Sequence, residues 1–204
     1  MKHLRMLGLA AVAAMALMAV VGVGTASATA VYGNEAKLGV GSTIEASLTG
    51  GTARLENTSK EVIDTCTGGG MKGSVNNAGG AAATPTVSLA KADFTWTGCT
   101  QNPTITIEGG VFEFHHISGT TSSTVTASAI KVTIAGIFGV SCTFTFGTTI
   151  DLGEAEGSSL KQALLRLRAW LNGLGSNSFL CPPHVFLNAD YKVTNYSNLY
   201  FEAS

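Results

Sequence analysis

Short runs in which apolar and polar residues alternate recur along the chain, each bounded by Gly, Asn, Ser or Pro. A period of two is typical of strands that bury one face. The pattern predicts ten strands, over residues 43–48, 61–66, 86–90, 93–97, 104–108, 111–116, 130–135, 142–146, 185–194 and 199–201. In two of these runs the aromatic side chains fall on one face and the threonines on the other, which favours antiparallel sheets with one solvated face.

One segment departs from this pattern. Its apolar residues recur at helical spacing, at Leu160, Ala163, Leu164, Leu167, Trp170, Leu171 and Leu174. That spacing predicts one amphipathic helix near 160–172, which packs its apolar stripe on the sheet. A helix on a membrane surface is the alternative, because three basic residues lie in the same stretch.

These elements predict an all-β fold, in the form of an antiparallel β-sandwich, with a closed β-barrel as the alternative. Residues 31–204 suit a single β-rich domain, because about 175 residues are enough to bury one core. The glycine triplet at 68–70 and the pairs at 79–80 and 109–110 are interpreted as turns between strands.

Residues 1–30 predict a cleaved secretory signal peptide. Lys2 and Arg5 give a positive start, an apolar stretch follows, and small residues surround two possible cleavage points, Ala28 and Ala30. A retained membrane anchor is the alternative, but the apolar run reaches only the lower edge of what spans a bilayer, and no second such run follows. The protein is therefore expected to be secreted, or held at the cell surface, with no integral span in the mature chain.

All four cysteines, Cys66, Cys99, Cys142 and Cys181, lie in the part that would remain after cleavage. An exported chain meets an oxidising compartment, so two disulfides are expected. Three connectivities are possible. The favoured one pairs the cysteines in sequence order, and each bridge would stabilise the fold by at most roughly 4 kcal/mol. A zinc site is the alternative, but no C-x-x-C pair occurs.

The amino-acid composition indicates a folded protein and excludes one class of binding partner. Charged residues make up 12% of the chain, about half of the usual fraction, while 45% of the residues are hydrophobic, which is too many for a disordered protein. The formal net charge is -1 and becomes -3 if the signal peptide is removed. Without a basic excess to neutralise phosphates, nucleic acid is excluded as a partner.

Candidate chemistry is sparse. Glu113 and His115 would share one face of a strand and are weak candidates for metal ligands, but no spacing supplies a third ligand. The chain lacks the G-x-S-x-G motif, and His115, His116 and His184 are the only histidines of the mature part that could act as a base. The glycine-rich stretch 68–73 lacks the order of a phosphate-binding loop. The sequence therefore predicts no catalytic residue and no cofactor.

Several segments, at residues 64–69, 94–100, 179–182, 190–194 and 199–201, surround cysteines or end strands. In these segments the chain resembles a group of exported actinobacterial proteins, β-rich and of uncharacterised function, with four cysteines. The resemblance implies export and two disulfides, and it implies no particular activity. The stretch 159–175 departs from what is expected in that group.

The expected function is that of a non-catalytic secreted or cell-surface protein, which binds a ligand that the sequence does not specify. Such a protein needs a contiguous exposed apolar or aromatic patch. A carrier of a small lipophilic ligand is the first alternative, and it needs an enclosed apolar cavity of roughly 300 Å³ or more. A secreted hydrolase is the second, and it needs a histidine in a cleft beside a carboxylate and a nucleophile.

Overall fold

The computed structural model of the chain is all-β. It describes residues 29–80, 84–101, 104–136, 139–146 and 150–203, and in these residues there is no helix. The strands are β1 (Thr29–Gly33), β2 (Ala36–Lys37), β3 (Thr43–Glu56), β4 (Val62–Asn77), β5 (Thr86–Cys99), β6 (Thr104–Glu108), β7 (Gly110–His116), β8 (Ser123–Ser128), β9 (Lys131–Ala135), β10 (Ser141–Thr145), β11 (Ile150–Ser158), β12 (Lys161–Gly173), β13 (His184–Val193) and β14 (Leu199–Ala203).

Eight of these strands close an antiparallel barrel. Their order is β11–β8–β7–β5–β4–β3–β13–β12, and β12 pairs back with β11. The closed barrel, and not the β-sandwich, is therefore the architecture of the chain. Register shifts in the ladders between the long strands bend and coil them, which a sheet needs in order to close on itself.

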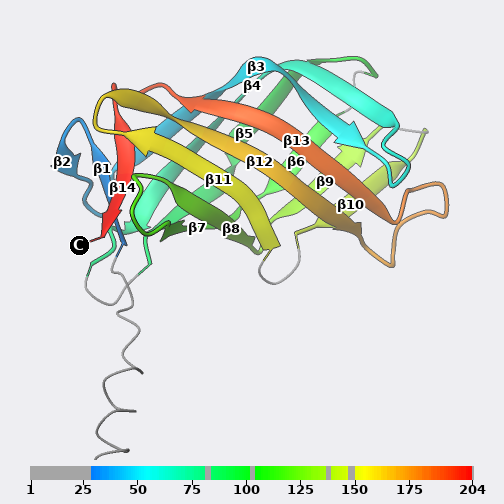
Figure 1. Cartoon of the computed structure of the whole chain (residues 1–204). Coiled ribbons are helices and arrows are strands. Elements are labelled where there is room, and N and C mark those ends of the chain that lie inside the picture. Colours follow the sequence, from blue (N-terminus) through cyan, green and yellow to red (C-terminus); the bar gives the residue numbers. More distant parts are fainter. Residues whose placement is uncertain (1–28, 81–83, 102–103, 137–138, 147–149, 204) are drawn as a thin grey trace, which may run out of the picture.

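The long strands extend beyond this ring. The C-terminal end of β12 pairs with β10, followed outward by β9 and β6, and β6 lies against β5. Two short arms therefore share the long strands. We call β7–β8–β11 the capped arm and β6–β9–β10 the disulfide arm. Figure 1 shows β1, β2 and β14 gathered at one end of the molecule, with the disulfide arm toward the other end.

A separate sheet of β14, β1 and β2 covers the mouth of the barrel beside the capped arm. β14 pairs with β1 over the whole length of both strands. Phe201 of β14 is fully buried and stacks on Phe114 of β7, with ring centroids 5.0 Å apart. β1 begins at Thr29, the first described residue, so the described sheet includes Thr29 and Ala30 as well as the residues from 31 onward.

The predicted helix near 160–172 is wrong. This segment forms β12, whose inward side chains are all buried, namely Ala163, Leu165, Leu167, Ala169 and Leu171. The helical spacing arises because Leu164 and Trp170, on the outer face, happen to extend a helix-like stripe. Ladders to β11 and β13 and the burial of the inward face outweigh the helix propensity of Leu, Ala and Arg.

The glycine triplet at 68–70 lies inside β4 and is not the predicted turn. Its residues pair with Thr97, Trp96 and Thr95 of β5. A Cβ atom on Gly69 would lie 2.5 Å from the Thr95 carbonyl oxygen and 2.8 Å from Cδ1 of Trp96. Gly69 is therefore needed for close packing against β5 and the Trp96 ring, and the triplet makes no chain reversal.

The ten predicted strands lie within strands of the structure to within one residue, and two of them belong to the single strand β5. The prediction missed β1, β2, β8 and β11, and it assigned β12 to a helix. No helix in the described part of the chain is long and apolar enough to cross a membrane.

Candidate functional site

The two candidate metal ligands, Glu113 and His115, lie on the outer face of β7. Glu113 Oε2 is 3.8 Å from His115 Nε2, and both side chains are partly exposed. Phe114 between them is buried, so the strand separates its alternate residues as predicted. Within the described residues no third potential ligand joins this pair. The pair has the arrangement of a surface contact.

The histidines do not form a hydrolytic relay with their described neighbours. His115 Nε2 lies 3.2 Å from Thr126 Oγ1, but the nearby carboxylate of Glu113 contacts the same nitrogen. A relay needs the hydroxyl and the carboxylate on different ring nitrogens. His116 Nε2 lies 2.6 Å from a backbone carbonyl oxygen, and the ring of His184 contacts an asparagine side chain.

The interior of the barrel is filled with side chains. Its apolar cavity has a volume of about 40 Å³ and is lined in part by Met71, Phe112, Leu165 and Phe201. Pockets that hold small organic ligands start at roughly 300 Å³. This interior therefore gives no support to the carrier alternative.

An aromatic pair, an exposed tryptophan beside a half-buried phenylalanine, lies on the outer face of β12 and β13. Trp170 is 42% exposed, and its ring centroid lies 5.1 Å from that of Phe186, which occupies the paired position on β13. The flanking residues Ala169 and Leu171 are buried, so the strand directs the indole outward. A large aromatic side chain that a strand exposes to solvent is typical of a binding surface.

Polar side chains continue on both sides of this pair. We call four consecutive outward pairs of the two strands the aromatic strip, which consists of Asn172, His184, Trp170, Phe186, Arg168, Asn188, Arg166 and Asp190. The strip is about 20 Å long, because each strand advances about 3.4 Å per residue. His184 Nδ1 is 2.9 Å from Asn172 Oδ1, and Arg168 Nη2 is 2.6 Å from Asp190 Oδ1. These contacts fix the polar groups around the rings.

The aromatic strip leads into a hollow on the outer surface between β8, β11 and β12. The hollow has a volume of about 440 Å³ and is lined by Thr124, Gly153, Glu154, Arg166 and Arg168. A second open hollow, of about 610 Å³, shares Glu154 and continues past Glu156 and Lys161. The aromatic strip and the two hollows together form one continuous polar surface, which we call the polar track, and the Trp170–Phe186 pair is its aromatic part.

Two disulfides cross-link the chain, as expected. Cys66 is bonded to Cys99, directly opposite it on β4 and β5, and Cys142 of β10 is bonded to Cys181 in the loop between β12 and β13. The bridges thus follow sequence order. In the described residues no cysteine is free.

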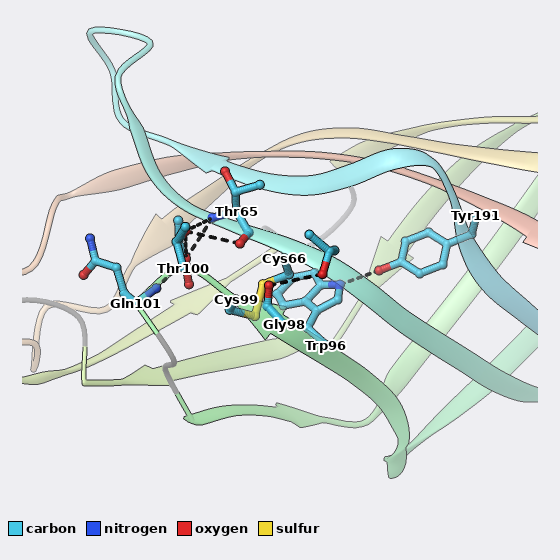
Figure 2. The surroundings of a disulfide bond; sticks show 10 residues. Thr65, Cys66, Trp96, Gly98, Cys99, Thr100, Gln101 and Tyr191 are labelled. Carbon is cyan, nitrogen blue, oxygen red and sulfur yellow. Dashed lines mark hydrogen bonds between the residues drawn. A yellow bond between two sulfur atoms is a disulfide. The ribbon is translucent and has the colours of Figure 1, made fainter.

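A buried aromatic cluster adjoins the bridge between β4 and β5. Figure 2 shows Trp96 beside this disulfide, with its indole N–H donating a hydrogen bond to the hydroxyl group of Tyr191. Tyr191 is fully buried, and its ring packs edge to face on Phe94. Burial raises the pKa of the Tyr191 hydroxyl group, which therefore stays a neutral partner for the indole.

Asp64 lies in the core next to the same disulfide and is only 1% exposed. Its Oδ1 accepts hydrogen bonds from the Thr65 N–H at 2.8 Å, the Thr100 hydroxyl at 2.7 Å and the Gln101 N–H at 3.2 Å. Its Oδ2 is buried and has no hydrogen-bond partner among the described residues. A carboxylate oxygen and the two sulfur atoms of the bridge lie within 4.8 Å of one another.

Comparison of the chain with protein-family models, with curated proteins and with solved structures found no match. Sequence reasoning missed the aromatic strip because it placed Trp170 in the buried stripe of a helix. The period of two at residues 163–171 was the signal that could have found it. A sequence signal for the Asp64 cluster existed as well, because Asp64 and Cys66 are two residues apart in one strand and so share a face.

Proposed function

We propose that this protein is a secreted or cell-surface binding protein without catalytic activity, and that it binds an extended polysaccharide along the aromatic strip. The observation that carries the proposal is the exposed Trp170 ring, which packs on the half-buried Phe186 on the outer face of the sheet. The polar track continues from these rings into two open hollows, so a polymer has room on one side of the aromatic pair.

A sugar ring has two kinds of surface. Its C–H face is apolar and packs on an aromatic ring, while its hydroxyl groups at the edge both donate and accept hydrogen bonds. Trp170 offers the first surface, and Asn172, Asn188, Arg168 and Asp190 offer partners for the second. A stable protein interface buries about 800 Å² on each partner and has a core depleted of charged residues. Here the charged side chain of Arg168, hydrogen-bonded to Asp190, lies next to the two rings, which fits a polar polymer better.

Three observations support the other parts of the proposal. The two disulfides are compatible with an oxidising compartment outside the cytoplasm. The described contacts of the three histidines differ from those of a hydrolytic relay. The small volume of the interior cavity favours binding on the surface. Export through a signal peptide and the resemblance to exported actinobacterial proteins stay predictions.

The test is a sedimentation assay with insoluble cellulose, chitin and peptidoglycan. The wild-type protein should be depleted from solution by at least one of the three. Trp170→Ala should weaken that binding at least tenfold, because removing a central aromatic contact in a binding site costs about 2 kcal/mol or more. Phe186→Ala should weaken it less, since that ring supports the indole from the side.

Phe179→Ala is the matched control, because Phe179 is 94% exposed in the loop after β12 and lies outside the aromatic strip. This variant should bind as the wild type does. Retention of full binding by Trp170→Ala, or loss of binding only in Phe179→Ala, would contradict the proposed face. Absence of binding to all three polymers would contradict a polysaccharide as the ligand. If the protein instead binds another protein through Trp170, the ligand is a protein and not a polysaccharide.

A further inference from the structure

The cluster around Asp64 has no role in the proposed binding face. Its unpartnered Oδ2 needs an explanation, because a buried carboxylate oxygen without a hydrogen bond is costly. The opposite oxygen is held by three donors, which fixes the carboxylate plane. Two sulfur atoms lie within ligand reach of this carboxylate. One oxygen and two sulfurs are a donor set that suits a thiophilic divalent cation.

We propose that the reduced form of this cluster is a metal site, in which Asp64, Cys66 and Cys99 bind Zn²⁺. In tetrahedral zinc sites the sulfur atoms stand about 3.8 Å apart, as Zn–S bonds of about 2.3 Å require. In the oxidised cluster a carboxylate oxygen of Asp64 lies within 4.8 Å of both sulfur atoms, and these are bonded to each other, so they must separate after reduction to hold the cation. Three protein ligands leave the fourth position to water.

The chemistry balances with an external dithiol as the reductant. The dithiol gives two electrons and two protons to the Cys66–Cys99 bond and becomes a cyclic disulfide, while the protein gains two thiols. Each thiol then loses one proton to solvent when it ligates the cation. Two thiolates and one carboxylate bring three negative charges to one Zn²⁺.

The second disulfide provides an internal control. Cys142 and Cys181 belong to no group of three potential ligands in the described part of the chain. Their sulfur atoms lie instead near backbone, with Cys181 Sγ 3.7 Å from the Ser141 carbonyl oxygen. Reduction of this bridge should therefore release two thiols without creating a comparable site.

The experiment uses the double variant Cys142→Ser/Cys181→Ser, reduced with dithiothreitol and freed of reductant without oxygen. Cd²⁺ titration, followed by thiolate-to-metal charge-transfer absorption, should end at one ion per chain. A large excess of Zn²⁺ should compete with Cd²⁺ and lower this absorption, and Zn²⁺ alone should raise the midpoint of thermal unfolding. Asp64→Asn in the same background should weaken Zn²⁺ affinity at least tenfold, since even outer-shell partners of metal sites contribute factors of about 10 to 100.

Two controls keep the outcome decisive. The oxidised double variant should bind no ion, and the variant Cys66→Ser/Cys99→Ser, reduced at its other bridge, should bind at least tenfold more weakly than the first variant. Circular dichroism should show the same β spectrum for the reduced chains with and without Asp64→Asn. If reduction unfolds the chain, its two free thiols should bind metal equally well with Asp or Asn at position 64. Equal Zn²⁺ affinity of the reduced chains with and without Asp64→Asn would therefore contradict the proposed site.

Discussion

The two arms that share the long strands are closed in different ways. The capped arm is joined by backbone ladders on both sides, β7 to β5 and β11 to β12, and is covered by β14. The disulfide arm pairs with β12 at only two positions, and no ladder joins β6 to β5 among the described residues. Both disulfides lie at this second arm or beside it, at Cys142–Cys181 and Cys66–Cys99.

The loop after β12 completes the pairing of the disulfide arm with side chains. Thr143 of β10 donates its N–H to Asn177 Oδ1 at 2.9 Å, and its carbonyl oxygen accepts from Asn177 Nδ2 at 2.7 Å. An asparagine thus takes the place of a strand partner, and Cys181 fixes the same loop to β10. The comparison teaches that covalent bonds support closure where the hydrogen-bond ladder is short.

The largest effect should come from removing both bridges, by serine substitution at all four cysteines. We expect the free energy of unfolding to fall by about 4 to 8 kcal/mol in urea titrations, at about 2 to 4 for each bridge. Hydrogen exchange should accelerate mainly in β6, β9 and β10. An equal loss of protection in β7, β8 and β11 would show that the two arms do not differ in this way.

The capped arm should depend most on Phe201. Phe201→Ala should destabilise the fold by about 3 to 5 kcal/mol, because the ring is fully buried and stacks on Phe114. Urea unfolding measures the loss, and exchange should accelerate first in β1 and β14. Phe179→Ala, at an exposed position, should change stability by less than about 0.5 kcal/mol. If Phe201→Ala lowers the free energy of unfolding as little as Phe179→Ala does, the sheet of β14, β1 and β2 contributes little to stability.

The smallest effect concerns the first two residues of β1. Thr29 and Ala30 pair with Ala203 and Glu202, and Ala30 is fully buried. A chain that starts at Val31 should be about 2 kcal/mol less stable than one that starts at Thr29, since it loses ladder hydrogen bonds and a buried methyl group. Urea titration of the two purified chains measures the difference.

The same argument favours one of the two cleavage points. Cleavage after Ala28, which lies outside the described residues, leaves β1 whole, whereas cleavage after Ala30 removes part of it. The mass of the exported protein should therefore correspond to a chain that begins at Thr29. A chain that begins at Val31 and is equally stable would contradict both the cleavage point and the role given to β1.

Strands with a clean alternation were predictable, and β12 shows where prediction failed. Residues 163–171 carry apolar side chains on both faces, because Leu164 and Trp170 point outward, so the sequence fits a helix and a strand. The choice between them depends on hydrogen-bond partners in the neighbouring strands β11 and β13, which the residue pattern of this segment alone does not reveal. Trp170 was consequently placed in the core, and the candidate binding face was missed.

By itself, the sequence determined the all-β class, most strands and the number of disulfides, because a period of two, turn residues and cysteine count are local properties. The closure into a barrel, the outward position of Trp170 and the contacts of Asp64 with Thr100 and Gln101 were decided only by the tertiary structure. Each of these depends on strand register, and register is set when distant strands exchange hydrogen bonds and bury a common core.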